Sequence, residues 1–259
     1  MLYFTYSEGF RNGGSTPVRD RSVLPSTFKP DLLTNYEIGA KTDWLDRRLR
    51  ANLTLYYMTW DDIQVQVEDP QPGVFALATV NFPQAENTGG YVELQWLALD
   101  NLTLGASLAH VDAELSQSST LCFPDDEGGQ VCLPPAQKGA RLPLTPDWKA
   151  TFSLDYTNSH QIWDASPFFR FDYSYVGESV NSLEGFESVV NLGDRSNTLP
   201  SYDEGNMQLG LESNKWTFTF SVDNVWDERA EQFLNNRWGS PRISISRPRT
   251  YGLTFRYNF

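Results

Sequence analysis

The sequence lacks the features that define several large classes of protein. No stretch approaches the roughly 18 consecutive apolar residues that a membrane-spanning helix requires, and the mean hydropathy is −0.45. Only 20 Lys and Arg stand against 33 Asp and Glu, whereas phosphate binding needs a basic surface. With two His and two Cys, the chain offers no transition-metal ligand spacing. We therefore expect no nucleic-acid partner and no transition-metal site.

Catalytic and targeting motifs are missing as well. No nucleophile–base set is visible, and the glycine pairs at 13–14, 89–90 and 128–129 lack the helix and Lys of a phosphate-binding loop. Residues 1–30 lack the basic and apolar regions of a secretory signal peptide. We expect a protein that is not an enzyme, with no catalytic, cofactor-binding or metal residues. For an outer-membrane protein, we also expect that an amino-terminal part is missing from this chain.

The clearest pattern that the sequence does contain is the alternation of its last residues. Thr250, Gly252, Thr254, Arg256 and Asn258 are polar or small, and they alternate with large apolar residues: Tyr251, Leu253, Phe255, Tyr257 and Phe259. A period of two places the two sets on opposite faces of a β-strand. A soluble domain seldom ends on a bare hydrophobic strand, because such an edge invites aggregation. The segment indicates an outer-membrane barrel. An aromatic content of 14% fits a barrel with interfacial aromatic girdles, but it fits a soluble β-sandwich rich in aromatic residues equally well.

Similar alternation recurs along the whole chain. We expect ten strands, at about 1–8, 33–45, 49–67, 90–98, 102–115, 148–157, 167–176, 204–213, 215–224 and 249–259. In seven stretches within these spans, at 35–44, 50–57, 91–96, 150–156, 169–175, 207–212 and 215–223, every charged residue falls on the polar face. The lengths match the roughly ten residues of a tilted membrane strand. A soluble β-sandwich would also keep charges off its core face, so the alternation alone does not separate the two folds.

The connections between the expected strands separate them better. Short connections lie at 46–48, 99–101, 158–166 and 214. Long connections lie at about 9–32, 68–89, 116–147, 177–203 and 225–248. Short periplasmic turns and long external loops are typical of an outer-membrane barrel, whereas a sandwich has no reason to sort its loops by length. The sequence thus predicts an all-β, transmembrane antiparallel β-barrel with its carboxy-terminus in the periplasm.

Several segments resemble those of TonB-dependent outer-membrane receptors. The segment 5–14 (TYSEGFRNGG) resembles their "YSEGFR-GG" run, and 35–41 (NYEIGAK) their "NYEIG-K" strand. The segment 53–66 resembles the strand that follows, 222–229 (VDNVWDER) the "NLFD-R" segment, and 247–259 the terminal strand. Each motif is weak alone, but together they cover essentially the whole chain in the family's order.

The resemblance implies a barrel of about 22 strands whose lumen is closed by an amino-terminal plug. Residues 1–259 would then form a partial barrel domain, comprising about the last ten strands and their extracellular loops. The plug, the TonB-contacting box and the first strands would be absent, and TonB would act only through that plug. The terminal residues Tyr251, Leu253, Phe255, Tyr257 and Phe259 would be an assembly signal for the barrel assembly machinery, captured by β-augmentation.

A few residues in the expected loops invite a closer interpretation. Cys122 and Cys132 are predicted to form a disulfide in an oxidising compartment, with two free thiols as the alternative. The acidic run 125–129 between them is either a cation site or, as we prefer, a solvated turn. Asp61 and Asp62 are expected to be structural, because neighbouring residues of a strand point to opposite faces. The loops also carry aromatic and Arg side chains to which we assign no site: Phe10, Arg11, Phe186, Phe233, Arg237 and Trp238.

Three hypotheses for the function follow. The first is the carboxy-terminal barrel region of a receptor in the bacterial outer membrane for TonB-dependent uptake of a scarce solute, such as a ferric siderophore or a similar large nutrient. The second is a small, self-contained outer-membrane barrel that acts as a passive pore or structural protein. The third is a soluble β-sandwich binding module. The substrate-binding residues are unknown from the sequence, and the expected partners are outer-membrane lipid, the barrel assembly machinery, the absent plug and the absent strands.

Overall fold

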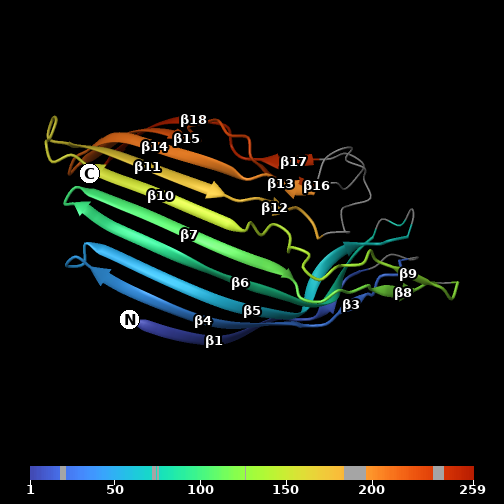
Figure 1. The fold of residues 1–259 in the computed structure, drawn as a ribbon. Coiled ribbons are helices and arrows are strands. Elements are labelled where there is room, and N and C mark those ends of the chain that lie inside the picture. The colour runs from blue at the N-terminus through green and yellow to red at the C-terminus, as the bar shows by residue number, and fades with distance from the viewer. Residues whose placement is uncertain (18–21, 72–73, 75, 126, 184–196, 236–241) are drawn as a thin grey trace.

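The computed structural model describes residues 1–17, 22–71, 74, 76–125, 127–183, 197–235 and 242–259. Within them it contains ten long strands in one antiparallel sheet, in the order β1-β4-β5-β6-β7-β10-β11-β14-β15-β18. Each strand pairs with its nearest long neighbours along the chain, so the sheet is a simple up-and-down meander (Figure 1). The predicted all-β barrel architecture is confirmed as a curved sheet of barrel strands, although the sheet does not close on itself.

The long strands lie close to the expected segments. They are β1 (Leu2–Arg11), β4 (Asp31–Trp44), β5 (Leu49–Glu68), β6 (Leu77–Leu99), β7 (Leu102–Leu115), β10 (Trp148–Thr157), β11 (Ser166–Val176), β14 (Tyr202–Glu212), β15 (Trp216–Asp223) and β18 (Thr250–Tyr257). No helix among the described residues is long and apolar enough to cross a membrane.

One boundary was predicted wrongly. The expected loop at 68–89 is mostly strand, because β6 begins at Leu77 rather than near 90. Pro83 explains the error: proline has no N–H for a ladder and normally argues against a strand. In the structure the regular pairs Asp61↔Gln84 and Ile63↔Phe82 flank it, and β6 simply continues past the proline.

In the described parts of the long connections there are four short two-stranded pairs. These are β2 (Gly14–Ser15) with β3 (Thr27–Phe28), β8 (Cys122–Pro124) with β9 (Gln130–Cys132), β12 (Ser179–Val180) with β13 (Thr198–Leu199), and β16 (Glu231–Asn235) with β17 (Arg242–Ile245). They all lie at the end of the sheet opposite the short turns (Figure 1). Both chain termini lie at the short-turn end, which is the periplasmic end for a barrel of this kind.

The strand register builds one apolar face across the sheet. A single row of paired residues runs Trp44, Leu49, Trp96, Leu104, Leu154, Phe171, Met207, Val222 and Tyr251, from β4 to β18. The row starts at the periplasmic end of β4 and finishes at the extracellular end of β18. That slant is the stagger between tilted strands that a barrel requires. Large apolar side chains on this face stay open to the surroundings, such as Leu253 with 72% exposure, as lipid contact demands.

The opposite face of the sheet is polar and linked by side-chain contacts. Arg170 donates from Nε to Asp155 Oδ2 at 2.8 Å across β10 and β11. The Tyr3 hydroxyl donates to Glu37 at 2.7 Å. This face corresponds to the lumen of a barrel, where lipid never reaches and charged groups keep polar partners.

Candidate functional site

The extracellular loop assembly is the candidate site, and the extended part of β5 and β6 forms its base. The β4–β5 ladder ends at Asp61 and the β6–β7 ladder at Ala85. Beyond these residues β5 and β6 pair only with each other as a two-stranded ribbon, which turns steeply away from the other strands (Figure 1). Asp62 has a φ of 53° inside the strand, a conformation that Asp tolerates better than most residues. Its carbonyl accepts a hydrogen bond from Asn81 Nδ2 at 2.7 Å. The expectation that Asp61 and Asp62 do not share a site agrees with this geometry, since Asp61 bonds Gln84 instead.

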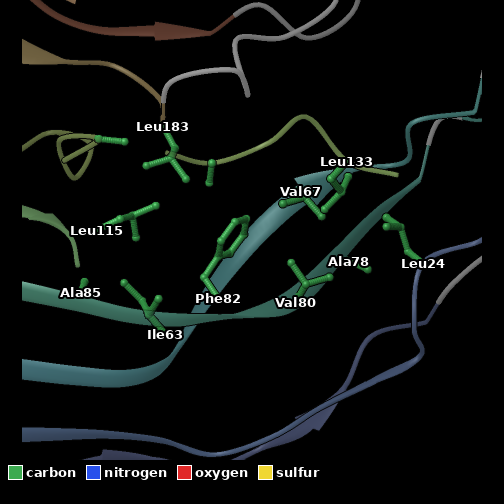
Figure 2. Packing of buried hydrophobic residues seen from close by; sticks show 12 residues of the cluster. Leu24, Ile63, Val67, Ala78, Val80, Phe82, Ala85, Leu115, Leu133 and Leu183 are labelled. Carbon is green, nitrogen blue, oxygen red and sulfur yellow. The ribbon is translucent and has the colours of Figure 1, made fainter. Parts of the chain in front are cut away.

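A small hydrophobic core fills the space between the ribbon and the loops. Ile63 and Phe82, paired across the ribbon, are 5% and 1% exposed. Figure 2 shows loop side chains converging on them from several connections. The core consists of Leu24, Ile63, Val67, Ala78, Val80, Phe82, Ala85, Leu115, Leu133, Ala136, Ala140 and Leu183. Three separate loops therefore pack together on one support, which holds the extracellular surface in a defined shape.

Polar side chains, one of them buried, link the loops further. Asp69, 7% exposed, accepts hydrogen bonds from Ser22 Oγ at 2.6 Å, from the Val23 N–H at 3.1 Å and from the Gln71 N–H at 2.9 Å. Asn181 forms a double hydrogen bond with the backbone of Leu234, at 2.9 and 2.7 Å. The first contact joins the loop after β1 to the loop after β5, and the second joins the loops after β11 and β15.

Arg11 lies at the extracellular end of β1 and is held by its neighbours. Its guanidinium donates to Asp31, whose side chain is 1% exposed. The same group lies 4.7 Å from the ring centroid of Trp60. Gln64 also donates its N–H to Asp31 at 3.4 Å. Arg11 thus fixes the extracellular ends of β1 and β4 to β5, which accounts for the side chain without a ligand.

The other loop residues singled out in the sequence have different surroundings. Phe10 is 72% exposed and Phe233 is 40% exposed. Phe186, Arg237 and Trp238 lie outside the described residues. The structure brings none of the described members together into one cluster.

The disulfide between Cys122 and Cys132 closes the β8–β9 hairpin, with 3.9 Å between the two Cα atoms. At the tip of this hairpin, Asp125 Oδ1 accepts the N–H groups of Glu127 at 3.0 Å and Gly129 at 2.6 Å. The Asp125 carboxylate is thus occupied by backbone N–H groups of its own turn, which favours a solvated turn over a cation site. Asp126 lies outside the described residues. The described part of the chain holds no group of three or more His, Cys, Asp or Glu that could bind a metal ion.

The segment after β15 is ordered by a polar network around Asn224. This side chain donates to the carbonyls of Glu228 and Arg247, each at 2.8 Å, and accepts the Glu228 N–H at 2.9 Å. Nearby, Asp227 accepts the Arg249 N–H at 2.8 Å. That hydrogen bond, with the Arg229 side chain 3.1 Å away, lowers the pKa of Asp227. The network ties the start of β18 to the end of β15.

Sequence reasoning missed Asp69, Asn181 and Asn224 as organisers of the loops. The Asp69-Pro70 dipeptide is a turn signal, and it could have drawn attention to Asp69. Asn181 carries no comparable signal, because it acts on backbone 53 residues away. Asn224 stands in the 222–229 segment that resembles the family's "NLFD-R" run, but its hydrogen bond to the Arg247 carbonyl, 23 residues away, could not be predicted from that segment. The five terminal residues expected to form the assembly signal lie on β18 and just after it, with Tyr251, Leu253, Phe255 and Phe259 between 63% and 114% exposed and Tyr257 at 47%.

A family model and a curated relative both relate this chain to outer-membrane receptors. The family model for the TonB dependent receptor-like β-barrel matches residues 1–225. The metal-pseudopaline receptor CntO of Pseudomonas aeruginosa is 24% identical over 261 residues, which cover 99% of this chain and 31% of CntO.

Solved structures show the same fold. The ferric yersiniabactin uptake receptor FyuA of Yersinia pestis superposes with a TM-score of 0.71 at 19% identity, covering all of this chain and 35% of FyuA. The ferric preacinetobactin receptor BauA of Acinetobacter baumannii gives 0.67 at 15% identity, covering all of this chain and 34% of BauA. The chain therefore spans about a third of the length of each of these relatives.

Proposed function

Because the chain belongs to the TonB-dependent receptor β-barrel family of the outer membrane, we propose that it forms part of a receptor for TonB-dependent uptake of a ferric siderophore or a similar metal chelate. The relatives compared above are named as receptors for metal chelates, and none of them is named as an enzyme. We assign residues 1–259 to part of the barrel domain, and no catalytic role to any residue.

The observation that carries the proposal is the open, lipid-facing sheet. Its apolar face runs through all ten strands, yet β1 and β18 stand at opposite ends of the strand order and do not pair with each other. An unpaired strand edge in hydrocarbon leaves backbone groups unsatisfied, at several kcal/mol each. A self-contained ten-stranded pore would require a β1–β18 ladder. The geometry favours a larger barrel, in which other strands complete both edges.

Four buried side-chain oxygen atoms without hydrogen-bond partners support the proposal that a plug domain fills the lumen. Within the described residues, Asn35 Oδ1, Asn52 Oδ1, Asn87 Oδ1 and Glu204 Oε1 have no hydrogen-bond partner. All four side chains alternate with the apolar set and so belong to the lumen face. A buried acceptor without a partner is costly, about 1–3 kcal/mol. We propose that the donors come from a plug domain inside the barrel, which would also be the part that contacts TonB.

The experiment compares metal-chelate uptake in cells with and without the gene. We expect deletion to abolish accumulation of one class of labelled metal chelate, and inactivation of TonB to have the same effect. Restoring the native gene should restore uptake. Passage of small solutes that persists without TonB would instead identify a passive pore.

The terminal strand supplies a further part of the proposal. Tyr251, Leu253, Phe255, Tyr257 and Phe259 would be recognised by the barrel assembly machinery, since an apolar strand with a free edge is suited to β-augmentation. Deleting Phe259 should slow insertion into the outer membrane in a pulse-chase assay. Unchanged insertion kinetics would contradict the assignment of an assembly signal.

A further inference from the structure

The disulfide between Cys122 and Cys132 borders the hydrophobic core that the loops share. Leu121 precedes the first cysteine and Leu133 follows the second, and the Leu133 N–H donates to the Leu121 carbonyl at 2.8 Å. Leu133 is 3% exposed within the core, and Leu121 and Phe123 pack against the core. The disulfide therefore holds together the two chain segments that bring these side chains to the core.

In the assembled barrel, both cysteines lie on the side of the membrane opposite the periplasm. The β8–β9 hairpin is at the extracellular end of the sheet (Figure 1), and Cys122 and Cys132 are exposed there. An outer-membrane protein reaches the membrane from the periplasm, and insertion then places this hairpin beyond the lipid. A periplasmic reactant therefore meets these thiols only before insertion.

The bond does not require the folded barrel. Cys122 and Cys132 are separated by 10 positions in the sequence, and a loop of this length closes in about 10–100 ns in a flexible chain. The unfolded chain in the periplasm can thus bring the two sulfur atoms together on its own. What it lacks is an acceptor for the electrons, because joining two thiols in a disulfide is an oxidation.

The residues between the two cysteines make their spontaneous oxidation slow. The segment 123–131 contains Asp125, Asp126 and Glu127 but no Lys, Arg or His. The thiolate is the species that attacks a disulfide, and positive neighbours favour it, whereas negative neighbours disfavour it. The same carboxylates repel anionic oxidants such as glutathione disulfide. The dithiol therefore needs an oxidant that reacts quickly with a small fraction of thiolate.

We propose that the uninserted chain is the substrate of a periplasmic dithiol oxidation, in which a protein disulfide oxidises Cys122 and Cys132 before the barrel enters the membrane. An oxidant whose own thiolate is a good leaving group suits this acidic segment, because exchange is faster with such a disulfide. Membrane insertion then consumes the oxidised chain. The inference uses the outer-membrane location and the hairpin, and it does not depend on which solute the receptor carries.

The reaction is a thiol–disulfide exchange in two steps. The thiolate of one cysteine attacks the disulfide of the oxidant, forms a mixed disulfide and releases one thiolate of the oxidant. The thiolate of the other cysteine attacks the chain's own sulfur in the mixed disulfide, which closes the Cys122–Cys132 bond and releases the second thiolate. The chain loses two electrons and two protons, and the oxidant gains them and leaves as a dithiol.

The test follows the full-length protein, expressed from its own gene, in its host and in the same host without its periplasmic dithiol oxidant. After a short radioactive pulse, samples are quenched with acid and treated with a polymer-bearing maleimide, so that each free thiol retards the band on a gel. Heat-modified mobility separates inserted from uninserted molecules. The variant C122S/C132S identifies the retardation that these two thiols cause.

We expect uninserted molecules in the unmodified host to lack both thiols already. Without the oxidant, the two thiols should persist about tenfold longer, because a thiol that is mostly protonated attacks only a reactive disulfide quickly. Added cystine, which has no net charge, should restore oxidation better than the anionic glutathione disulfide at the same concentration. Free thiols on inserted molecules in the unmodified host, or equal rates of oxidation in the two hosts, would overturn the proposal.

Neutralising the carboxylates between the cysteines tests why the oxidant is needed. The variant D125N/D126N/E127Q should narrow the difference between the two hosts. The control D112N/D203N/E228Q, which neutralises three exposed acids elsewhere at the extracellular end, should leave that difference unchanged. An unchanged difference in the first variant, or equal narrowing in both, would refute the part of the proposal that rests on charge.

Discussion

The membrane part and the extracellular part of β5 follow the same alternation of apolar side chains, but these side chains lie in different surroundings. In the membrane part, Leu53 and Leu55 are 46% and 51% exposed. In the extracellular part, Ile63 and Val67 continue the same alternation but are 5% and 4% exposed. Lipid covers the first pair, so no protein has to. The second pair lies outside the membrane, where the surroundings are water. Leaving apolar surface in water is unfavourable, so loop residues from three connections cover this pair.

This difference explains why the two parts look so unlike each other. The membrane sheet is a single layer with a polar lumen, whereas the extracellular part contains the main hydrophobic core of the described chain. An exposed Leu is normal in the first part and a defect in the second. Four substitutions or conditions test the comparison, in order of decreasing expected effect.

Phe82→Ala should have the largest effect, because its ring is 1% exposed within the loop core. Truncating a buried Phe typically costs about 3–5 kcal/mol. We expect hydrogen exchange to rise across the loops that supply Leu24, Leu133 and Leu183, while the membrane strands keep their protection. Phe10→Ala, at a 72% exposed position, is the control and should stay within about 0.5 kcal/mol of the native protein. Equal effects of the two variants would show that the loop core does not hold the loops.

Leu154→Arg or Phe220→Arg should destabilise the barrel by roughly 2–4 kcal/mol, because each side chain faces lipid. Ser153→Arg, one residue from Leu154 on the lumen face, should cost much less. A reversible unfolding titration of the protein in lipid vesicles measures all three. Similar losses for Leu154→Arg and Ser153→Arg would reverse the assignment of the two faces.

The double variant Cys122→Ser/Cys132→Ser should open the β8–β9 hairpin. A disulfide closing so short a loop stabilises it by on the order of 2–3 kcal/mol in the chain-entropy model. Faster proteolysis within 119–136, without a change in the membrane strands, is the expected result. Non-reducing peptide mapping of the native protein should show one linked species. Complete alkylation of both thiols without prior reduction would mean that the cysteines are free.

Lowering the pH should weaken the contact between the start of β18 and the end of β15, with a smaller effect on stability than the substitutions above. The pKa of Asp227 is lowered chiefly by the hydrogen bond from the Arg249 N–H; burial acts in the opposite direction, and Arg229 lowers the pKa further. A folded pKa below the unfolded one means that the stabilisation is complete above the unfolded pKa of about 3.9. It is lost as pH falls through the lower, folded value. Protection of the Arg249 amide, corrected for intrinsic exchange, should decrease in that range, and Asp227→Asn should remove the dependence.

The regular part of this protein could be predicted from its sequence. Alternation placed all ten long strands, and the short and long connections gave their direction, because a strand with two different faces encodes both its period and its register locally. The loop assembly could not be predicted in the same way. Pro83 concealed the first half of β6, and the members of the loop core lie as far apart as Leu24 and Leu183.

The sequence by itself determined which residues of each strand meet lipid and which meet the lumen, because that choice follows from a two-residue period within each segment. Only the tertiary structure decided where along a strand the apolar side chains stop facing lipid and begin to pack against other parts of the protein. The steep turn of the β5–β6 ribbon beyond Asp62, the loop side chains that cover Phe82, and the indole of Trp226 over Gly205 all depend on contacts between segments distant in the chain. Outside the membrane, an apolar side chain is buried only when residues from another segment of the chain cover it. The alternation within one strand does not show which segment that is.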